Sequence, residues 1–154
     1  MLDKPTLLKV AAQQTAVIHL YVLGREMPKY MHPAMEELAK TLAAQGIKPA
    51  GPMFTFHHRM PSEIFDFEVG FPVTEAVKAS GRVVPGELPA GDVLRTTYHG
   101  PYEGLAEAWR EFLEQVAATG REAAPTFWES YAAGPETGTD TSKWRTELNR
   151  PLVG

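Results

Sequence analysis

The order of landmarks in the first half of this sequence recurs in the second half, and this duplication restricts the possible folds more than any other feature. The matching landmarks lie about 73 to 79 residues apart, with short differences in loop length. They are Gly24 and Gly100, Gly46 and Gly120, Pro52 and Pro125, and the segments 68–73 and 147–152. We expect the two units to pack together, because a unit of this size alone leaves one sheet face uncovered.

The first half carries one helical pattern and three strand patterns. Residues 15–23 are rich in β-branched and aromatic side chains, and a glycine follows them. A helix is expected to start near Pro33, a residue suited to the first helical turn, and to end at Gly46. Strands are expected at 52–58 and 64–73, the second with alternating apolar and polar residues. The order predicted for the first half is therefore β-α-β-β.

The second half predicts the same order of elements. A strand is expected at 92–99, before a glycine. Apolar residues at helical spacing predict a helix over 102–116, and Gly120 follows as its C-terminal cap. Two further strands are expected at 126–131 and 144–152. Both halves are thus predicted to be β-α-β-β units.

These patterns predict an α+β fold, with two units related by a pseudo-twofold within a single domain, 1–154. The units cover about 13–74 and about 92–153. The connector between them, about 75–91, is rich in glycine and proline, with a short strand expected at 82–84. We expect two antiparallel sheets with a concave groove between the halves, a common place for a ligand.

The composition excludes several classes of function. The net charge is −4 and the basic residues do not cluster, which argues against direct nucleic-acid binding. The absence of cysteine excludes a disulfide scaffold, a thiolate nucleophile and cysteine-based metal sites. The first residues lack the apolar core of a signal peptide, and no apolar run approaches the roughly 20 residues of a membrane span. We therefore expect a cytoplasmic protein without membrane contact, of an oligomeric state that the sequence leaves open.

No metal site and no cofactor are expected. The histidines are His19, His32, His57, His58 and His99, and none forms a ligand spacing such as His-x-x-x-His. The adjacent pair is expected to point to opposite faces of a strand. The sequence also lacks a glycine-rich phosphate loop and a Gly-x-Ser-x-Gly nucleophile motif.

Glu129 is the sharpest candidate for a functional residue. Strand alternation places Phe127, Glu129 and Tyr131 on one face, with Trp128 and Ser130 on the other. A carboxylate buried without a partner is costly, so it takes up a proton, finds a donor or waits for a cation. The alternative is an ordinary strand glutamate, satisfied by local hydrogen bonds or by a salt bridge.

Aromatic residues provide candidate walls for a site around this carboxylate. In the first half, Phe54, Phe56 and His58 occupy the face that we take as equivalent to the face of Glu129. If the two faces meet, a cation there would gain about 0.5 to 2 kcal/mol for each well-placed aromatic ring. Aromatic strand positions also occur in ordinary cores, which is the alternative for most of these residues. Further candidates are Phe71, Trp109, Trp128, Tyr98 and Tyr21.

Several short motifs, taken in order, resemble the GyrI-like small-molecule-binding domain. The matching segments are 51–56, 66–73, 88–91, 99–102, 128–131 and 146–152. This family includes effector-binding domains of AraC- and MerR-type multidrug-responsive regulators, and stand-alone proteins. The resemblance implies a duplicated β-α-β-β fold and a pocket at the pseudo-twofold interface. It also implies that Glu129 and Tyr131, which match the family's Glu-x-Tyr motif, meet cationic, lipophilic ligands there.

The resemblance leaves three functions open. The leading one is a binding protein that captures amphipathic, often cationic aromatic molecules. The second is a hydrolase of cyclopropane-bearing electrophiles, similar to some members of the superfamily, with Glu129 as acid or base and Tyr131 as its helper. The third is an inhibitor of another protein, because some stand-alone members resemble gyrase inhibitors. The chain has no room for a helix-turn-helix beside this domain, so DNA-binding regulation is not expected of it.

Overall fold

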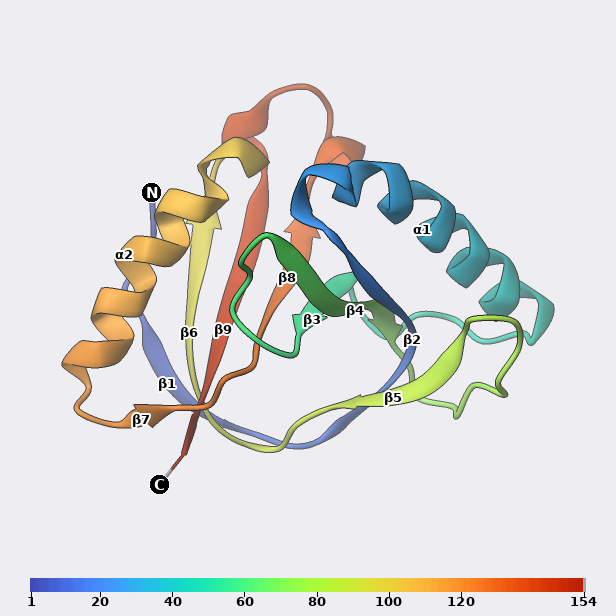
Figure 1. The fold of residues 1–154 in the computed structure, drawn as a ribbon, viewed down its shortest axis with the longest axis horizontal. Helices are drawn as coiled ribbons and strands as arrows, with labels where there is room; N and C mark the ends of the chain where they lie inside the picture. Colours follow the sequence, from blue (N-terminus) through green and yellow to red (C-terminus); the bar gives the residue numbers. More distant parts are fainter. Residues whose placement is uncertain (154) are drawn as a thin grey trace.

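The computed structural model describes residues 1–153, in which a curled antiparallel sheet carries two helices (Figure 1). The strands are β1 (Thr6–Val10), β2 (Gln13–Leu23), β3 (Phe54–His57), β4 (Ile64–Pro72), β5 (Val84–Leu88), β6 (Gly91–His99), β7 (Glu122–Ala123), β8 (Phe127–Ala133) and β9 (Arg145–Val153). The helices are α1 (Met27–Ala44) and α2 (Leu105–Ala118), with short 3-10 helices at Gly24–Glu26, Tyr102–Gly104, Pro135–Thr137 and Thr141–Lys143. Across residues 1–153, no helix has both the length and the apolar character that crossing a membrane requires. The predicted α+β class is confirmed.

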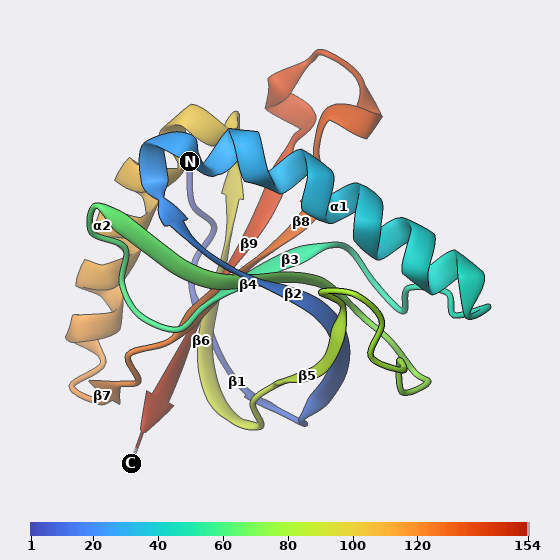
Figure 2. The same cartoon turned by 45° about the vertical axis from the view of Figure 1, so that its right-hand side comes forward.

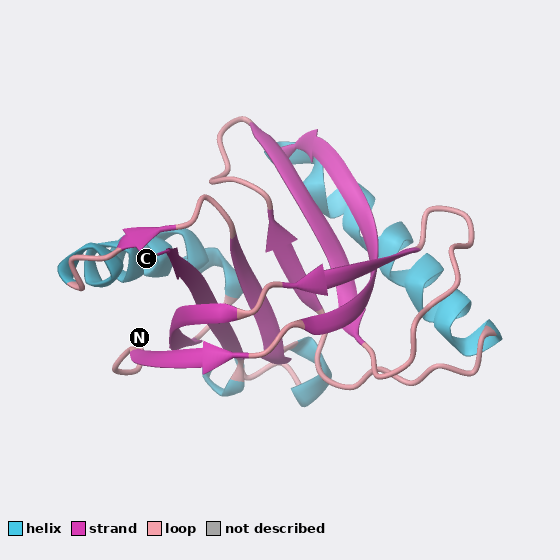
Figure 3. Cartoon of the chain, turned by 90° about the horizontal axis from the view of Figure 1, so that it is seen from below, coloured by secondary structure: helices cyan, strands magenta, loops and turns pink. Residues whose placement is uncertain are grey.

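The strand order is symmetric about the centre of the sheet. It runs β1-β6-β9-β8-β3-β4-β2-β5, with β7 paired to β9. The halves join where β3 pairs with β8, with Thr55 opposite Glu129. At the two edges, β1 pairs with β6 and β5 pairs with β2, so each half gives its leading strand to the other. The two predicted half-sheets therefore form one continuous curled sheet, as Figure 3 shows, and each β-α-β-β unit gains a leading strand.

Helix α1 begins at Met27, so the predicted start near Pro33 is wrong. Pro28 lies in the first turn, where a missing backbone N–H leaves no helical hydrogen bond unmade. Pro33 lies inside the helix at an exposed position, and the carbonyl that loses its donor belongs to Lys29, which is also exposed. Water can satisfy this carbonyl, and the helix therefore continues through the second proline.

Both helices cover the same face of the sheet, α1 over the first half and α2 over the second (Figure 2). Under α1, Leu38 and Leu42 pack on β2 and β4, and under α2, Phe112 and Val116 belong to a separate core. A third cluster lies on the other face and includes Val17, Phe54, Phe56, Val93 and Trp128. Side chains from β1 and β5, the two edges of the sheet, pack on this third cluster, so it fills the inside of the curl.

Candidate functional site

A groove of about 1040 Å³ lies between the two helices, over the strands at the centre of the sheet. Its floor comes from β3 and β8, the pair that joins the halves. His57, Phe127, Glu129 and Tyr131 line this floor. The junction of the two halves thus forms the base of a concave site.

Each helix turns a stripe of apolar side chains, spaced four residues apart, toward the groove. The stripes are Met27, Met31 and Met35 on α1, and Leu105, Trp109 and Leu113 on α2. Met53 and Met60 also line the groove, so five of the six methionines of the chain face it. Thioether side chains are flexible and polarizable, and a wall made of them adapts to ligands of different shapes.

Glu129 places a carboxylate in this apolar groove, without a cationic partner among residues 1–153. The residue is 8% exposed. Trp109 donates its Nε1–H to Oε2 at 3.1 Å, and the Tyr131 hydroxyl donates to Oε1 at a long 3.4 Å. Burial raises the pKa of Glu129 above its ordinary value of 4.5, and these two uncharged donors offset the rise only in part.

A chain of polar contacts continues from Glu129 along the floor. The Tyr131 hydroxyl lies 2.8 Å from Oγ1 of Thr55, which in turn lies 3.2 Å from Nε2 of His57. Burial and then the Glu129 charge raise the pKa of Tyr131 well above its ordinary value. Because each hydroxyl has one proton, these hydrogen bonds all point the same way. His57 Nε2–H donates to Thr55, Thr55 donates to Tyr131, and Tyr131 donates to an ionised Glu129. These hydrogen bonds therefore hold the carboxylate and the tyrosine in a fixed arrangement.

His57 ends this chain as a buried, neutral imidazole. Its ring stacks on Phe127 at a centroid distance of 4.5 Å and on Phe67 at 5.1 Å. Burial, followed by repulsion from the neighbouring His58, lowers the pKa of His57 to about 4. Its Nδ1 atom is buried and has no hydrogen-bond partner among residues 1–153. His57 therefore brings no positive charge to the groove at neutral pH.

The rim of the groove carries aromatic and charged groups. Tyr102 lies edge-on to Tyr131, with ring centroids 5.8 Å apart. Burial, and then the charges of Glu136 and Glu129, raise the pKa of Tyr102 above its ordinary value. Arg110 also lines the rim, but its guanidinium pairs with Glu107 on the exposed side of α2. The two phenol rings thus line the groove close to the buried carboxylate.

The structure brings four of the predicted site residues together in the groove. Glu129, Tyr131, Trp109 and Phe71 all line it. Trp109 also belongs to the core of the second half, and its indole N–H donates to Glu129.

Five predicted residues lie elsewhere, and the predicted meeting of Phe54 and Phe56 with Glu129 is wrong. In the β3–β8 register Thr55 pairs with Glu129, so Phe54 and Phe56 point into the curl, beside Trp128. Neighbouring residues of a strand face opposite sides, and an error of one residue therefore reverses a whole face. The remaining two also lie outside the groove: Tyr98 is a core residue of the second half, and Tyr21 is exposed on the face away from the helices.

Several groove residues were not predicted from the sequence. The predicted register places His57 on the face away from Glu129, and the sequence patterns predict no role for the methionines. Thr55, which contacts Tyr131 without lining the groove, shares the face of His57. The spacing of Met27, Met31 and Met35 was a visible signal, since positions i, i+4 and i+8 lie on one side of a helix. A second methionine stripe is absent from α2, where Leu105 and Trp109 occupy the matching side.

Comparison with known proteins gives a family and a set of similar folds. The sequence profile described as the GyrI-like small molecule binding domain matches residues 3–152. No curated protein is a significant match. The C-terminal domain of EcmrR superposes with a TM-score of 0.85 and 21% identity, covering 97% of both chains.

Other solved structures resemble the chain over nearly its whole length. EcmrR in its complex with DNA gives a TM-score of 0.84 and 22% identity, and the chain covers 57% of the length of that protein. SAV2435 bound to tetraphenylphosphonium gives 0.66 and 13% identity, covering 99% of this chain and 95% of that one. A hydrolase from Listeria innocua gives 0.62 and 15% identity, covering 97% and 92%. At these identities, the likenesses show the fold.

Proposed function

We propose that this chain, which belongs to the GyrI-like small-molecule-binding domain family, binds lipophilic cations with aromatic groups in the groove between its helices. One observation carries the proposal: Glu129 is a buried carboxylate in an apolar groove, and both of its donors among residues 1–153 are uncharged. Such a carboxylate lacks a counter-charge, and a ligand cation supplies it.

The walls of the groove suit the apolar part of such a ligand. Trp109 and Phe127 stand beside Glu129, with their rings edge to face at 4.5 Å. A desolvated cation near aromatic rings gains about 0.5 to 2 kcal/mol per ring. The methionine stripe of α1 offers the opposite side of the ligand a surface that adjusts to its shape.

Two further observations support this class of ligand. SAV2435, which has a similar fold, has been solved with tetraphenylphosphonium, a lipophilic aromatic cation. The net charge of −4 also favours a cation over a nucleic acid as partner. We propose that the chain acts in the cytoplasm. We propose no contact with a membrane and no direct contact with nucleic acid.

Binding of tetraphenylphosphonium to the variant Glu129→Gln tests the proposal. Glutamine keeps the shape of the side chain and removes its charge, and loss of one partner of a buried charge pair costs about 2 kcal/mol or more. We expect the dissociation constant, measured by isothermal titration calorimetry, to rise about 30-fold. Glu136→Gln is the matched control, since it removes the same charge from the exposed rim of the groove and should change affinity less than about threefold. Equal affinities of the wild type and Glu129→Gln would refute the proposal.

The contact between Glu129 and Tyr131 favours one second candidate, a hydrolase of cyclopropane-bearing electrophiles. Burial raises the pKa of Glu129, which favours its protonated form more than in an exposed glutamate, so the residue can act as acid or base. Opening the strained ring needs a proton on the leaving carbon and a hydroxyl from water on the other. The wild type should then convert such a substrate to a product one water heavier, detected by mass spectrometry. Saturable binding without product excludes this candidate.

A further inference from the structure

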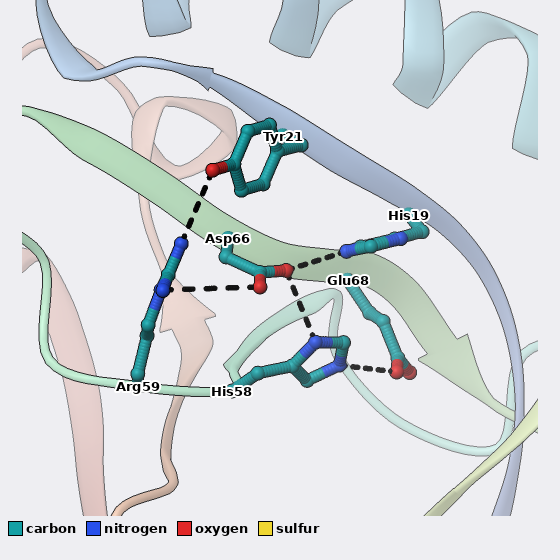
Figure 4. A network of polar contacts seen from close by, with 6 residues as sticks. All are labelled: His19, Tyr21, His58, Arg59, Asp66 and Glu68. Atoms are coloured by element: carbon teal, nitrogen blue, oxygen red, sulfur yellow. Dashed lines mark hydrogen bonds and ion pairs between the residues drawn. The ribbon is translucent and has the colours of Figure 1, made fainter.

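Four side chains with metal-ligating atoms come together on the sheet face away from the helices, as Figure 4 shows. His19 belongs to β2, His58 directly follows β3, and Asp66 and Glu68 belong to β4. One ligating atom from each of His19, His58 and Asp66 lies within 4.8 Å of the others. None of the four residues lines the groove, so the cluster is separate from the proposed ligand site.

Strand pairing builds this cluster from distant parts of the sequence. His19 pairs with Glu68 in the β2–β4 register, and Tyr21 pairs with Asp66. The backbone N–H of His58 donates to the carbonyl of Asp66 at 3.0 Å, which extends the β3–β4 ladder by one step. The three strands therefore hold the side chains on one surface, although the sequence shows no ligand spacing.

We infer that His19, His58 and Asp66 bind a divalent transition-metal ion of the Zn²⁺ type. Nε2 of His19 lies 2.5 Å from Oδ1 of Asp66, and Nδ1 of His58 lies 3.1 Å from the same oxygen. Bonds of about 2.0 to 2.2 Å to an ion require only small side-chain rotations from this arrangement. Two imidazoles and one carboxylate suit Zn²⁺, Co²⁺ or Ni²⁺, whereas Mg²⁺ and Ca²⁺ prefer oxygen ligands alone.

Two neighbours already hold the ligands in position. Oε2 of Glu68 lies 2.6 Å from Nε2 of His58, which leaves Nδ1 as the nitrogen for the ion. A carboxylate on the second ring nitrogen is the usual support of a metal-ligating histidine, because it fixes the tautomer and the ring orientation. Nε of Arg59 lies 4.0 Å from Oδ2 of Asp66, so Oδ1 faces the two imidazoles.

The cluster is open to an ion from solution. The His19 side chain is 51% exposed and that of His58 is 33% exposed, whereas the two carboxylates are about four-fifths covered. Water can complete a tetrahedral site on the exposed side. An ion that binds here replaces the direct contacts of the two imidazoles with Oδ1 of Asp66.

The test is a titration of Zn²⁺ into the chelator-treated full chain, with Co²⁺ as a spectroscopic probe. We expect one ion per chain and a ligand-field absorption band with Co²⁺. His58→Gln and His19→Gln should each weaken binding at least tenfold and remove the band. Glu68→Gln should weaken it by about 10- to 100-fold, the usual effect of losing the support of a ligating histidine. Mg²⁺ should not compete.

The matched control is His32→Gln. His32 also pairs with a carboxylate, at 2.9 Å from Glu36, but on the exposed side of α1 and without a third ligand. Its loss should leave Zn²⁺ affinity unchanged. Because His19 is half exposed, circular dichroism should show that His19→Gln folds as the wild type does. Absent Zn²⁺ binding, or affinity equal in His58→Gln, His19→Gln and His32→Gln, would overturn the inference.

Discussion

Two successive histidines of the chain lie on opposite faces of the sheet, in opposite chemical surroundings. His57 is stacked between the rings of Phe67 and Phe127 on the groove side, and its one side-chain hydrogen-bond partner among residues 1–153 is the hydroxyl of Thr55. His58 lies on the other face, with one carboxylate oxygen at each ring nitrogen. Adjacent strand positions are predicted to point to opposite faces, and the structure confirms this for His57 and His58.

The carboxylates on the two faces differ in the same way. Burial raises the pKa of Glu129, whose donors are uncharged, whereas hydrogen bonding from His19 lowers the pKa of Asp66. One face thus presents a carboxylate that lacks a counter-charge, and the other presents carboxylates already matched by imidazoles. We infer that the partners of a carboxylate, and its access to water, determine whether it attracts a ligand cation.

Of the variants that test this difference, His57→Phe should have the largest effect, which is on the pH dependence of the free energy of unfolding. The pKa of His57 falls from 6.5 in the unfolded chain to about 4 in the folded one, so the unfolded state binds more protons between these values. Folding stability is then fully present above pH 6.5 and decreases by about 3 kcal/mol as the pH falls to about 4. In His57→Phe the decrease in stability between pH 6.5 and about 4 should be absent. Urea unfolding of the metal-free protein across this pH range measures it. His32→Gln, at an exposed position, should keep the wild-type slope.

The next-largest effect concerns the free energy of unfolding of the protein, which depends on the charge of Glu129. Because the folded pKa of Glu129 is raised, its burial destabilises the fold above that pKa and stops doing so below the ordinary value of 4.5. At pH 8, Glu129→Gln should therefore be more stable than the wild type, by about 2 kcal/mol. The gain should vanish as the pH falls below 4.5. A variant that is less stable than the wild type at pH 8 would mean that Glu129 has a favourable partner in the folded chain.

The smallest expected effect concerns Thr55, whose hydroxyl contacts both Tyr131 and His57. Thr55→Val removes contacts to Tyr131 and His57 and should destabilise the fold by about 1 kcal/mol. Thr146→Val is the matched control, because Oγ1 of Thr146 is buried with no hydrogen-bond partner among residues 1–153. That variant should be neutral or more stable in thermal unfolding. Equal losses in both would show that the polar chain contributes nothing.

The sequence predicted the fold well because glycines, prolines and apolar periods mark the duplicated units. The predicted register of β3 was wrong, because a shift of one residue moves every side chain of a strand to the opposite face of the sheet. Gly46 and Gly120 lie 74 residues apart but Pro52 and Pro125 lie 73 apart, so alignment on the prolines reverses the side chains of β3. Alignment on the glycines instead places Thr55 opposite Glu129, as the structure does.

Other parts of the two sites depend on contacts that no local pattern encodes. Trp109 meets Glu129 only because α2 packs over β8, and a helix stripe alone does not distinguish a groove wall from a core. His19 meets His58 only through the pairing of β2, β3 and β4. Such long-range meetings follow from the topology, which the sequence gives only in outline.

Titration of the Glu129 carboxyl by carbon-detected NMR tests the central claim most directly. In chelator-treated protein, Glu129 should titrate above 4.5, and Asp66 should titrate below 3.8. Saturation with tetraphenylphosphonium should lower the pKa of Glu129, because the cation favours the ionised form. A Glu129 pKa at or below its ordinary value in the free protein, or one that the cation leaves unchanged, would contradict the account.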